Sequence, residues 1–512
     1  MLTATTFRDF LERLRAAGRC ATVPRRVNPR QELAAVLHRA LTTTGQAVHF
    51  TDVGIPGVTV AGNVFAGRDK YALLLGQPIE KLAETFERYW DFQPLEPRQV
   101  KRAASQEVVH EGEVDLPALL PVPTHYARDG GPFITAAVVL VRDPQGGAMN
   151  ASFQRIMVHG GNKLGIQILP RMNLKAIHDR AVARRLDLPV ALAIGAEPAL
   201  FISGGIHIPE DADEYTFAGA VQEKPLEVVP AKTNGLLVPA NSEIIVEGFI
   251  SHREVREEGP FGEMHRYYGT RSPKPVITVT AITHRLQPIY HTLFSGNLEE
   301  HAVCALPREG AMLRHLRKIS PEVKGASFLP YFMRCVVSVG NCDEPTLEKL
   351  LEGIMQHTWV RMGILVNDDI DIDNAEDILW AILTRTDPKR DFHFRQFDID
   401  LALEDIHFPP FASKRMMLGQ EPPPEDVVVS PFDLRFLGHD SQVRIAINAA
   451  VPAAARPWFR RAQVAGSKEV NLDDYLAAAP PRRPRPRRAR RGVSGDGGAP
   501  AGRPRRGGTP QG

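Results

Sequence analysis

Apolar residues in the first part of the chain recur at the spacing of a helix face and of short strands. Residues 5–18 are predicted to form an amphipathic helix that begins at Thr6 and ends at Gly18, with an apolar face made of Phe7, Phe10, Leu11 and Leu14. Residues 20–100 alternate helical patterns with short apolar runs such as Ala47–Phe50 and Val58–Ala61. This alternation predicts an α/β region over residues 1–115.

Strand patterns dominate residues 116–305. Apolar, β-branched runs separated by glycine and proline predict strands at Ile134–Val141, Val190–Ile194, Glu243–Phe249 and Val276–Thr283. Residues 173–185 predict a single helix that crosses this region. Many strands with few helices favour a barrel or a sandwich.

Helices and strands alternate again over residues 306–455. Strands are predicted at Met333–Val339 and Gly363–Val366, and helices at Glu344–His357 and Ala375–Leu383. Apolar residues become rare after residue 453, and from about residue 479 the chain consists mainly of proline, arginine and glycine. Such a segment cannot build a core, so we expect it to be disordered.

The composition is that of a globular chain. Its 512 residues are 43% hydrophobic and 24% charged. No apolar run reaches the roughly 18 residues that a membrane-spanning helix needs, and the N-terminus lacks the apolar stretch of a secretory signal. The four cysteines, Cys20, Cys304, Cys335 and Cys342, form no CxxC pair. We therefore expect reduced thiols and a cytoplasmic protein.

The small net charge of +2 hides an uneven distribution of charge. Residues 481–512 contain ten arginines and one acid, Asp496, so this tail carries +9 and residues 1–480 carry −7. The body therefore lacks the basic charge of a nucleic-acid-binding domain. The tail has no aromatic residue on which bases could stack, so a solvated tail is favoured over a nucleic-acid contact.

Two glutamates flank a segment rich in glycine and proline, Glu258-Gly-Pro-Phe-Gly-Glu263, which cannot form a regular helix. A tight loop can direct both carboxyl groups into one cavity, where their repulsion keeps one of them protonated as a proton donor. A solvated acidic turn explains the same spacing, and Glu254 and Glu257 just upstream support it. The spacing alone favours the turn.

Other polar segments suggest ligand binding, each beside a plainer alternative. Within Asn150–Arg155, the arginine can hold a carboxylate through two hydrogen bonds and the asparagine offers an oxygen to a hard cation, or the two are ordinary surface and turn residues. The acidic run over residues 210–214 can bind a divalent ion or form a solvated loop. His159–Lys163 is a weak phosphate-binding pattern. No HExxH, GxSxG or Walker motif occurs, and the spacing of His207, His265 and His291 is not that of zinc ligands.

Taken together and in order, these segments resemble the UbiD family of decarboxylases, which use prenylated FMN (prFMN). The resemblance runs from about residue 110 to about residue 420, and it is expected to extend to the N-terminus. Its specific parts are Asn150-x4-Arg155, DEYTFAGA at 213–220, NGLLVPANSEIIVEG at 234–248 and EGPFGE at 258–263. Supporting parts are Asn367-Asp-Asp, TRTDPKRD at 384–391 and Ser413-Lys414.

The resemblance implies a mixed α/β (α+β) fold. A central split β-barrel of flavin-reductase type would occupy residues 116–305, with α/β regions over residues 1–115 and 306–455 on either side. Residues 456–512 would form a C-terminal extension with the disordered Arg/Pro/Gly-rich tail. The family also implies a homo-oligomer, either a dimer or a hexamer.

Roles for individual residues follow from the resemblance as well. The catalytic trio of the family matches Arg155, Glu258 and Glu263, where the Arg155–Glu258 pair orients the substrate and Glu263 donates the proton. The residues that would contact the cofactor are Arg155 itself with Asn150, Ser152, Met172, Asn173, Glu214 and Lys414. A divalent ion, usually Mn2+, would bind Asn150 and Glu214, and K+ would bind backbone carbonyls around Gly204–Ile206.

One position departs from the family pattern. The third metal ligand of the family is a histidine shortly after the arginine, whereas this chain has Pro-Arg-Met-Asn-Leu at 170–174. Asn173 could supply an oxygen at this register, and His178 and His207 are alternatives that fit less well by position. Loss of the imidazole is expected to weaken or alter metal binding.

The implied activity is the reversible, non-oxidative decarboxylation of an aromatic or α,β-unsaturated carboxylic acid, with the modified flavin as electron sink. A separate flavin prenyltransferase would supply that cofactor. The substrate pocket is expected at Thr135, Leu169, Met172 and Met264, which form a largely apolar wall. Alternatives of other classes are a non-catalytic flavin- or metal-binding relative, a hydrolase with two carboxylates, and a protein whose tail binds nucleic acid.

Overall fold

The helix predicted at the N-terminus is α1 (Phe7–Ala16) in the computed structural model. The Asp9 amide donates a hydrogen bond of 3.1 Å to the Thr6 hydroxyl, which caps the helix, and the four predicted apolar residues are buried. The structure describes residues 2–169, 172–206, 208, 212–269, 271–331, 333–357, 360–398, 441–459 and 461–462. The predictions that concern Lys414, His207 and the C-terminal tail lie outside these residues.

A four-stranded sheet in the order β1-β2-β3-β18 forms the N-terminal part. Its strands are β1 (Cys20–Val23), β2 (Ala47–Phe50), β3 (Thr59–Gly62) and β18 (Ile289–His291). The accompanying helices are α2 (Glu32–Thr44), α3 (Arg68–Leu75) and α4 (Leu82–Tyr89), with a 3-10 turn η1 (Ile79–Lys81). The strand β18 runs parallel to β3 although the two lie far apart in the sequence.

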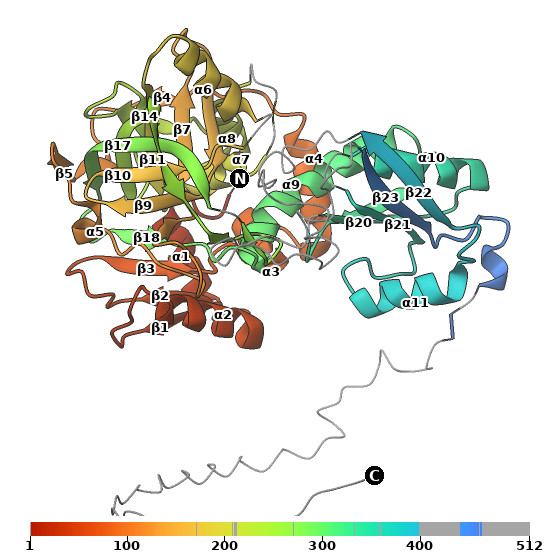
Figure 1. Ribbon diagram of the computed structural model, residues 1–512. Coiled ribbons are helices and arrows are strands. Elements are labelled where there is room, and N and C mark those ends of the chain that lie inside the picture. The colour runs from red at the N-terminus through yellow and green to blue at the C-terminus, as the bar shows by residue number, and fades with distance from the viewer. Residues whose placement is uncertain are drawn as a thin grey trace, which may run out of the picture. The chain divides into compact units, whose positions relative to one another are not determined.

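A nine-stranded antiparallel sheet forms the middle of the molecule. Its order is β6-β9-β10-β17-β14-β11-β7-β8, with β5 paired to β17, and it curls into a half barrel (Figure 1). The strands are β5 (Val108–Glu111), β6 (Phe133–Ile134), β7 (Val138–Arg142), β8 (Met149–Phe153), β9 (Ile156–Gly160), β10 (Lys163–Ile166), β11 (Leu188–Ile194), β14 (Ile244–Glu258) and β17 (Ser272–His284). The predicted mixed α/β fold is confirmed, whereas the split barrel of flavin-reductase type stays a prediction.

Smaller elements complete this part. A three-stranded sheet contains β4 (Arg98–Gln99), β12 (Glu227–Pro230) and β13 (Leu237–Pro239), and a two-stranded one contains β15 (Phe261–Gly262) and β16 (Tyr268–Gly269). The helices are α5 (Leu116–Leu119), α6 (Asn173–Ala183), α7 (Pro198–Gly204), α8 (Glu214–Gln222) and the 3-10 turn η2 (Ala104–Gln106).

Three predictions for this region need correction. The run Ile134–Val141 is two strands, because Thr135 leaves the sheet and donates its hydroxyl to the Leu293 carbonyl at 2.6 Å. Strand β14 continues to Glu258, so this glutamate ends a strand and does not lie within a loop. More than one helix occurs here: α7 is buried over nearly its whole length, so it lacks the amphipathic period that would have predicted it.

A five-stranded sheet in the order β19-β20-β21-β23-β22 forms the C-terminal part. Its strands are β19 (Val323–Ser327), β20 (Arg334–Val339), β21 (Met362–Asn367), β22 (Phe392–Asp398) and β23 (Ser441–Asn448). The helices α10 (Glu344–Met355) and α11 (Ala375–Arg385) and the turn η3 (Arg456–Trp458) accompany them. The predicted elements of this part are confirmed to within a few residues, while the predicted domain boundaries stay predictions.

The long helix α9 (Leu298–Arg317) leads from the middle part to the C-terminal part and packs against α4. Arg68 of α3 donates to both carboxylate oxygens of Glu309 on α9, at 2.6 and 2.7 Å. The same guanidinium lies 3.0 Å from an Asp373 oxygen, in the segment before α11. The Glu309 side chain is fully buried, so this ion pair links three parts of the fold from within.

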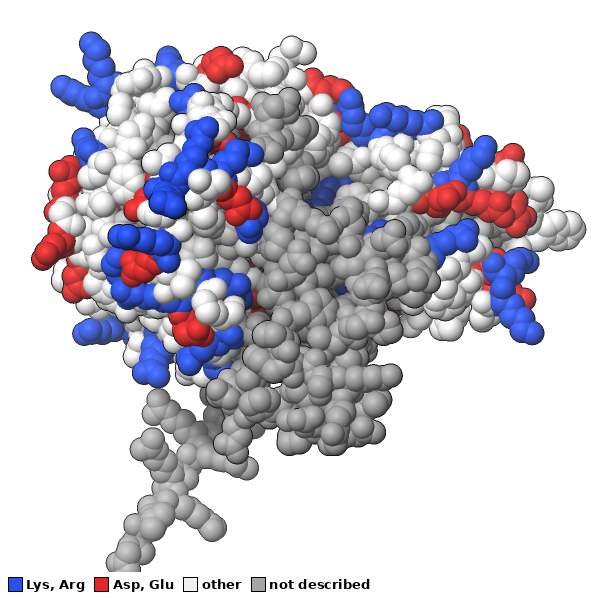
Figure 2. Space-filling view, turned by 45° about the horizontal axis from the view of Figure 1, so that its top comes forward, with Lys and Arg blue, Asp and Glu red and all other residues white. Residues whose placement is uncertain are grey.

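Acidic and basic side chains are interspersed over the described surface that Figure 2 shows. Some form ion pairs, such as Lys163 with Glu254 at 2.8 Å. Among the described residues, no helix has the length and apolar character needed to cross a bilayer.

Candidate active site

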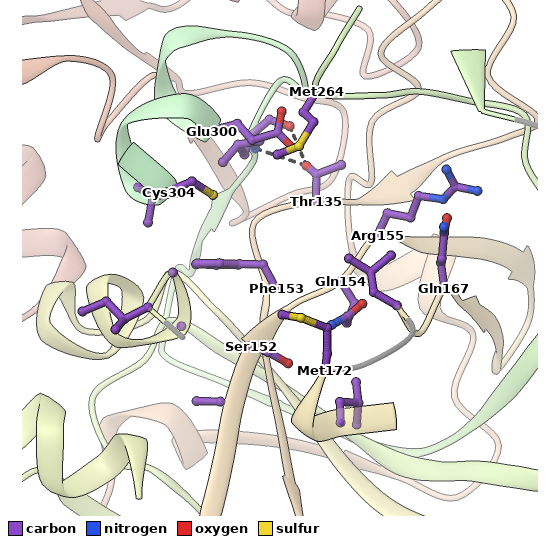
Figure 3. Close-up of a pocket in the computed structure, with 18 of the residues that line it drawn as sticks. Thr135, Ser152, Phe153, Gln154, Arg155, Gln167, Met172, Met264, Glu300 and Cys304 are labelled. Atoms are coloured by element: carbon purple, nitrogen blue, oxygen red, sulfur yellow. Dashed lines mark hydrogen bonds between the residues drawn. The ribbon is translucent and has the colours of Figure 1, made fainter. Parts of the chain in front are cut away.

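A cavity of about 200 Å3 lies between β8, the segment before α6, the segment after β15 and the first turns of α9 (Figure 3). Ten of the predicted site residues line it: Thr135, Asn150, Ser152, Arg155, Leu169, Met172, Asn173, Glu214, Glu263 and Met264. Gly204–Ile206, the predicted potassium-binding segment, lines it too. Residues from distant parts of the sequence therefore meet at one site.

Arg155, in the cavity wall, and Glu258 form a buried, bidentate ion pair. The Arg155 Nε and Nη2 atoms donate to the two Glu258 oxygens at 2.9 and 2.6 Å. The side chain of Arg155 is 8% exposed and that of Glu258 is fully buried, and the guanidinium lies 5.4 Å from the Phe261 ring centre. Burial alone would lower the pKa of Arg155, but Glu258 and Glu263 raise it, so the guanidinium stays charged. The pair fixes the direction of the guanidinium.

Glu263 reaches the same guanidinium from the cavity. Arg155 Nη1 donates a hydrogen bond to Glu263 Oε1, and the Glu263 side chain is 16% exposed. Burial raises the pKa of Glu263, Arg155 opposes this rise and Glu258 adds to it. A carboxyl group with a raised pKa holds its proton to higher pH than one in water, so it can act as a proton donor.

Asp129 holds the segment that carries Glu263. Its Oδ1 accepts from the Gly262 amide at 2.9 Å, and its Oδ2 accepts from the amides of Tyr126 and His125 at 2.8 and 3.2 Å. The Gly130 amide also donates to the Pro260 carbonyl at 2.7 Å. One half-buried carboxylate thus joins the segment before β6 to β15.

Gly269 makes room for the ion pair between Arg155 and Glu263. A Cβ atom at this position would lie 2.7 Å from Glu263 Oε1 and 2.9 Å from Arg155 Nη1. Both distances are shorter than real Cβ contacts, so a larger residue would push the ion pair apart. The glycine belongs to β16, whose pairing with β15 places it beside the trio.

Asn150 and Glu214 form a second polar group in the cavity. The Asn150 amide donates to Glu214 Oε1 at 3.1 Å. Asn150 Oδ1, Glu214 Oε2 and Ser152 Oγ are buried without a hydrogen-bond partner in the described chain, and burial raises the pKa of Glu214 to about 8. Unpartnered oxygens of these kinds fit a hard divalent cation that completes its shell with ligand oxygens. The predicted metal-binding residues are therefore chemically suited to that role.

Asn173 is the first residue of α6, and its side chain lines the cavity and donates to the Ile208 carbonyl at 3.2 Å. His178 is buried on the same helix and is absent from the cavity wall, so the structure brings Asn173 to the site and not His178. No group of three histidine, cysteine or acidic residues able to hold a metal occurs in the described ranges. A metal here would depend on an amide and one carboxylate more than on imidazole.

The sequence reasoning missed several residues of this cavity. Three of them lie four residues apart on α9 and line the cavity on one face of this helix: Glu300, Cys304 and Arg308. The sequence contains this spacing, but no helix was predicted there. Burial raises the pKa of Glu300 to about 7. Gln154 and Gln167 also line the wall, and no motif marks them.

Three family models match consecutive parts of the chain. They are the N-terminal domain of 3-octaprenyl-4-hydroxybenzoate carboxy-lyase (UbiD) over residues 11–89, its Rift-related domain over residues 98–298 and its C-terminal domain over residues 301–405. Among curated proteins, an anhydromevalonate phosphate decarboxylase from Methanosarcina mazei is 31% identical over 385 residues, which covers 74% of this chain and 87% of that relative.

Solved structures agree with these matches. The UbiD-class enzyme HmfF from Pelotomaculum thermopropionicum, in complex with FMN, is 30% identical with a TM-score of 0.80, covering 92% of this chain and 100% of that one. An evolved dimeric form of HmfF in complex with prFMN is 29% identical with a TM-score of 0.79 and the same coverage. The vanillic acid decarboxylase of Sedimentibacter hydroxybenzoicus in its open form is 25% identical with a TM-score of 0.76, covering 91% and 97% of the two chains.

Proposed function

The chain belongs to the UbiD family of carboxy-lyases, and from this premise we propose that it catalyses the reversible, non-oxidative decarboxylation of an aromatic or α,β-unsaturated carboxylic acid with prFMN. The observation that carries the proposal is the buried Arg155–Glu258 pair with Glu263 bonded to the same guanidinium. A protein that only bound flavin would have no need of this trio.

Arg155 is proposed to orient the carboxylate of the substrate. Its guanidinium is held by Glu258 through two hydrogen bonds, so little rotational freedom is lost when a ligand binds. Glu263 is proposed to donate a proton to the carbon that loses CO2, and its raised pKa supports this role. When bound, prFMN supplies the electron sink that the loss of CO2 from such a carbon requires.

The cavity contains residues that are chemically suited to bind the cofactor and its ions. Asn150, Glu214 and Asn173 are proposed to hold Mn2+ or another divalent ion, and Ser152, Met172 and Lys414 would contact the cofactor. Gly204–Ile206 are proposed to hold K+. The unpartnered oxygens of Asn150, Ser152 and Glu214 support this arrangement.

Several further parts of the proposal rest on the family more than on the site. The middle sheet would be a split barrel of flavin-reductase type, the enzyme would work as a homo-oligomer, and a flavin prenyltransferase would supply prFMN. A cytoplasmic location is proposed because all four cysteines are free thiols. Thr135, Leu169, Met172 and Met264 are proposed to contact the substrate, as all four line the cavity.

The test is a decarboxylation assay on protein co-expressed with a flavin prenyltransferase and supplied with Mn2+ and K+. Native mass spectrometry is expected to show bound prFMN and one divalent ion. When the reaction is run in D2O, the product is expected to carry deuterium at the carbon that lost CO2. Glu263→Gln is expected to keep the cofactor and to lose turnover by roughly 100-fold or more. The matched control is Glu257→Gln, a change at an exposed residue next to the trio.

Two results would contradict the proposal in different ways. Full turnover by Glu263→Gln would remove Glu263 as the proton donor. A folded protein that takes up no cofactor would favour the alternative of a non-catalytic family relative, which the asparagine in place of the usual histidine motivates.

A further inference from the structure

Two buried glutamines line the cavity beside Arg155. Gln154 is 6% exposed and Gln167 is 3% exposed. Gln154 Nε2 and Gln167 Oε1 have no hydrogen-bond partner within the described chain. Figure 3 shows both side chains in the cavity wall on the side of Arg155, across from Glu300 and Cys304. Buried polar atoms are almost always paired in folded proteins, so these two atoms are suited to bind a polar group that enters the cavity.

The hairpin of β9 and β10 explains why the two amides lie beside the arginine. Ile156 pairs with Ile166 at the open end of this hairpin, so the next residues outward, Arg155 and Gln167, face each other. The backbone N–H of Gln167 donates a hydrogen bond to the backbone carbonyl of Arg155 at 3.3 Å, and Gln154 precedes Arg155 in the chain. The backbone therefore fixes both glutamines at the residue proposed to orient the substrate carboxylate.

The two amides are separated from the proposed metal-binding residues. Gln154 follows Asn150 by four residues, which is about 13 Å along an extended chain. Asn150 and Glu214 already bond to each other. The glutamines thus belong to the part of the cavity that contains Arg155.

The chemistry of the amides narrows the choice of ligand. The unpartnered atom of Gln154 is its amide nitrogen, which donates, and that of Gln167 is its amide oxygen, which accepts. A carboxylate only accepts hydrogen bonds, so the carboxylate at Arg155 cannot satisfy the Gln167 oxygen. A hydroxyl group both donates and accepts, and it can satisfy one atom of each glutamine.

We propose that Gln154 and Gln167 form a polar subsite beside Arg155, and that the substrate is a hydroxylated acid whose hydroxyl group occupies this subsite. The proposal rests on the proposed function for the position of the carboxylate. The imide edge of a flavin presents the same alternation of donor and acceptor, so the experiment must separate a substrate contact from a cofactor contact.

The experiment compares the wild-type protein with Gln154→Met and Gln167→Met, which remove the amides at nearly constant volume. Calorimetry first measures the affinity of each full-length protein for FMN. It then measures the affinity of each FMN-loaded protein for benzoate and for 2-, 3- and 4-hydroxybenzoate. Gln93→Met, on the exposed surface, is the control. Gln167→Asn keeps an amide and replaces the methionine variant if that variant does not fold.

We expect the wild-type protein to bind at least one hydroxybenzoate tenfold or more tightly than benzoate. Both methionine variants are expected to lose this preference to within threefold, while their affinity for FMN changes less than twofold. A tenfold loss of FMN affinity with an unchanged preference would assign the glutamines to the cofactor and overturn the proposal. A wild-type protein without any preference for a hydroxylated acid would overturn it as well.

Neither binding measurement requires turnover, so the proposal of the subsite and the proposal of the reaction can be contradicted independently. An enzyme that binds hydroxybenzoates through the glutamines but never decarboxylates them would contradict the proposed function alone. An enzyme that decarboxylates acids without regard to their hydroxyl groups would contradict the subsite alone.

Discussion

Glu300 is a half-buried carboxyl group in the cavity wall, at the third position of α9. It accepts hydrogen bonds from the Ser295 hydroxyl at 3.0 Å and from the Gly296 amide at 2.5 Å. Burial raises its pKa from the ordinary value of 4.5 to about 7, against these bonds. The folded protein therefore holds a proton there that the unfolded chain releases.

This difference makes stability depend on pH. Between about pH 4.5 and pH 7 the native state binds more protons than the unfolded state, so the free energy of unfolding falls as pH rises. We expect Glu300→Gln to gain roughly 3 kcal/mol relative to the wild type between pH 4.5 and pH 8. Urea unfolding at a series of pH values measures this, with the exposed Glu113→Gln as control. Parallel pH curves for Glu300→Gln and the wild type would contradict it.

The residues of the site differ in how far the sequence could predict them. Spacing alone favoured a solvated turn for Glu258 and Glu263, and only the family resemblance raised them to catalytic candidates. Their partner Arg155 lies more than a hundred residues away, a separation that no local pattern encodes. Gln154 and Gln167 carry neither charge nor motif, so only their burial without partners reveals them.

At the scale of elements, the position of Glu263 depends on a clamp in which Asp129 joins two segments. Asp129 accepts hydrogen bonds from amides on both sides, including that of Gly262, the residue before Glu263. Its negative charge also contributes to the raised pKa of Glu263, after burial and Glu258. The clamp therefore affects both the position and the proton affinity of the proposed donor.

Asp129→Asn tests this clamp. The amide keeps one acceptor and turns a donor toward backbone amides, so the loop shifts, and turnover is expected to fall roughly 10- to 100-fold. Loss of the negative charge lowers the pKa of Glu263, so the alkaline decline of kcat should begin at a lower pH. A pH–rate profile measures both effects, with Asp115→Asn, an exposed change, as control. A lower kcat with an unmoved profile would mean that Asp129 is merely structural.

Elements with a regular period were predicted well, and buried or interrupted ones were not. The amphipathic helix α1 and the strand β2 follow directly from the spacing of their apolar residues. The break between β6 and β7 depends on Thr135 bonding to Leu293, a contact between distant segments. The helix α7 was not predicted for a different reason. Its residues are apolar on all sides, so the sequence lacks the periodic pattern that distinguishes an amphipathic helix.

At the scale of the whole molecule, the charge of the chain divides at its C-terminal end. Residues 481–512 carry +9 and the remainder carries −7. A chain that ends at Pro480 is expected to lose retention on a heparin column at low salt and to keep the turnover of the full-length protein. Column retention and the decarboxylation assay check this pair of outcomes, and a truncated chain without turnover would make the tail part of the enzyme.

The order of strands could not be read from the sequence. The pattern predicted strands for the middle region, yet the nine-stranded order depends on which distant segments pair, such as β10 with β17. Pairing of this kind is decided by burial across the whole fold and not by any single segment. The predicted fold class was therefore correct while the topology remained open.

The return of β18 to the N-terminal sheet has a consequence for how this gene can be cut and recombined. Its neighbour β3 ends at Gly62, whereas β18 begins at Ile289, so any breakpoint between them separates two hydrogen-bonded strands. Arg68 and Glu309 add a second tie across nearly the same interval. Chimeras that exchange residues 98–298 alone would thus take β18 from one parent and the other three strands of this sheet from the other parent. The boundaries between the three family models therefore do not mark positions at which the chain can be divided without separating paired strands.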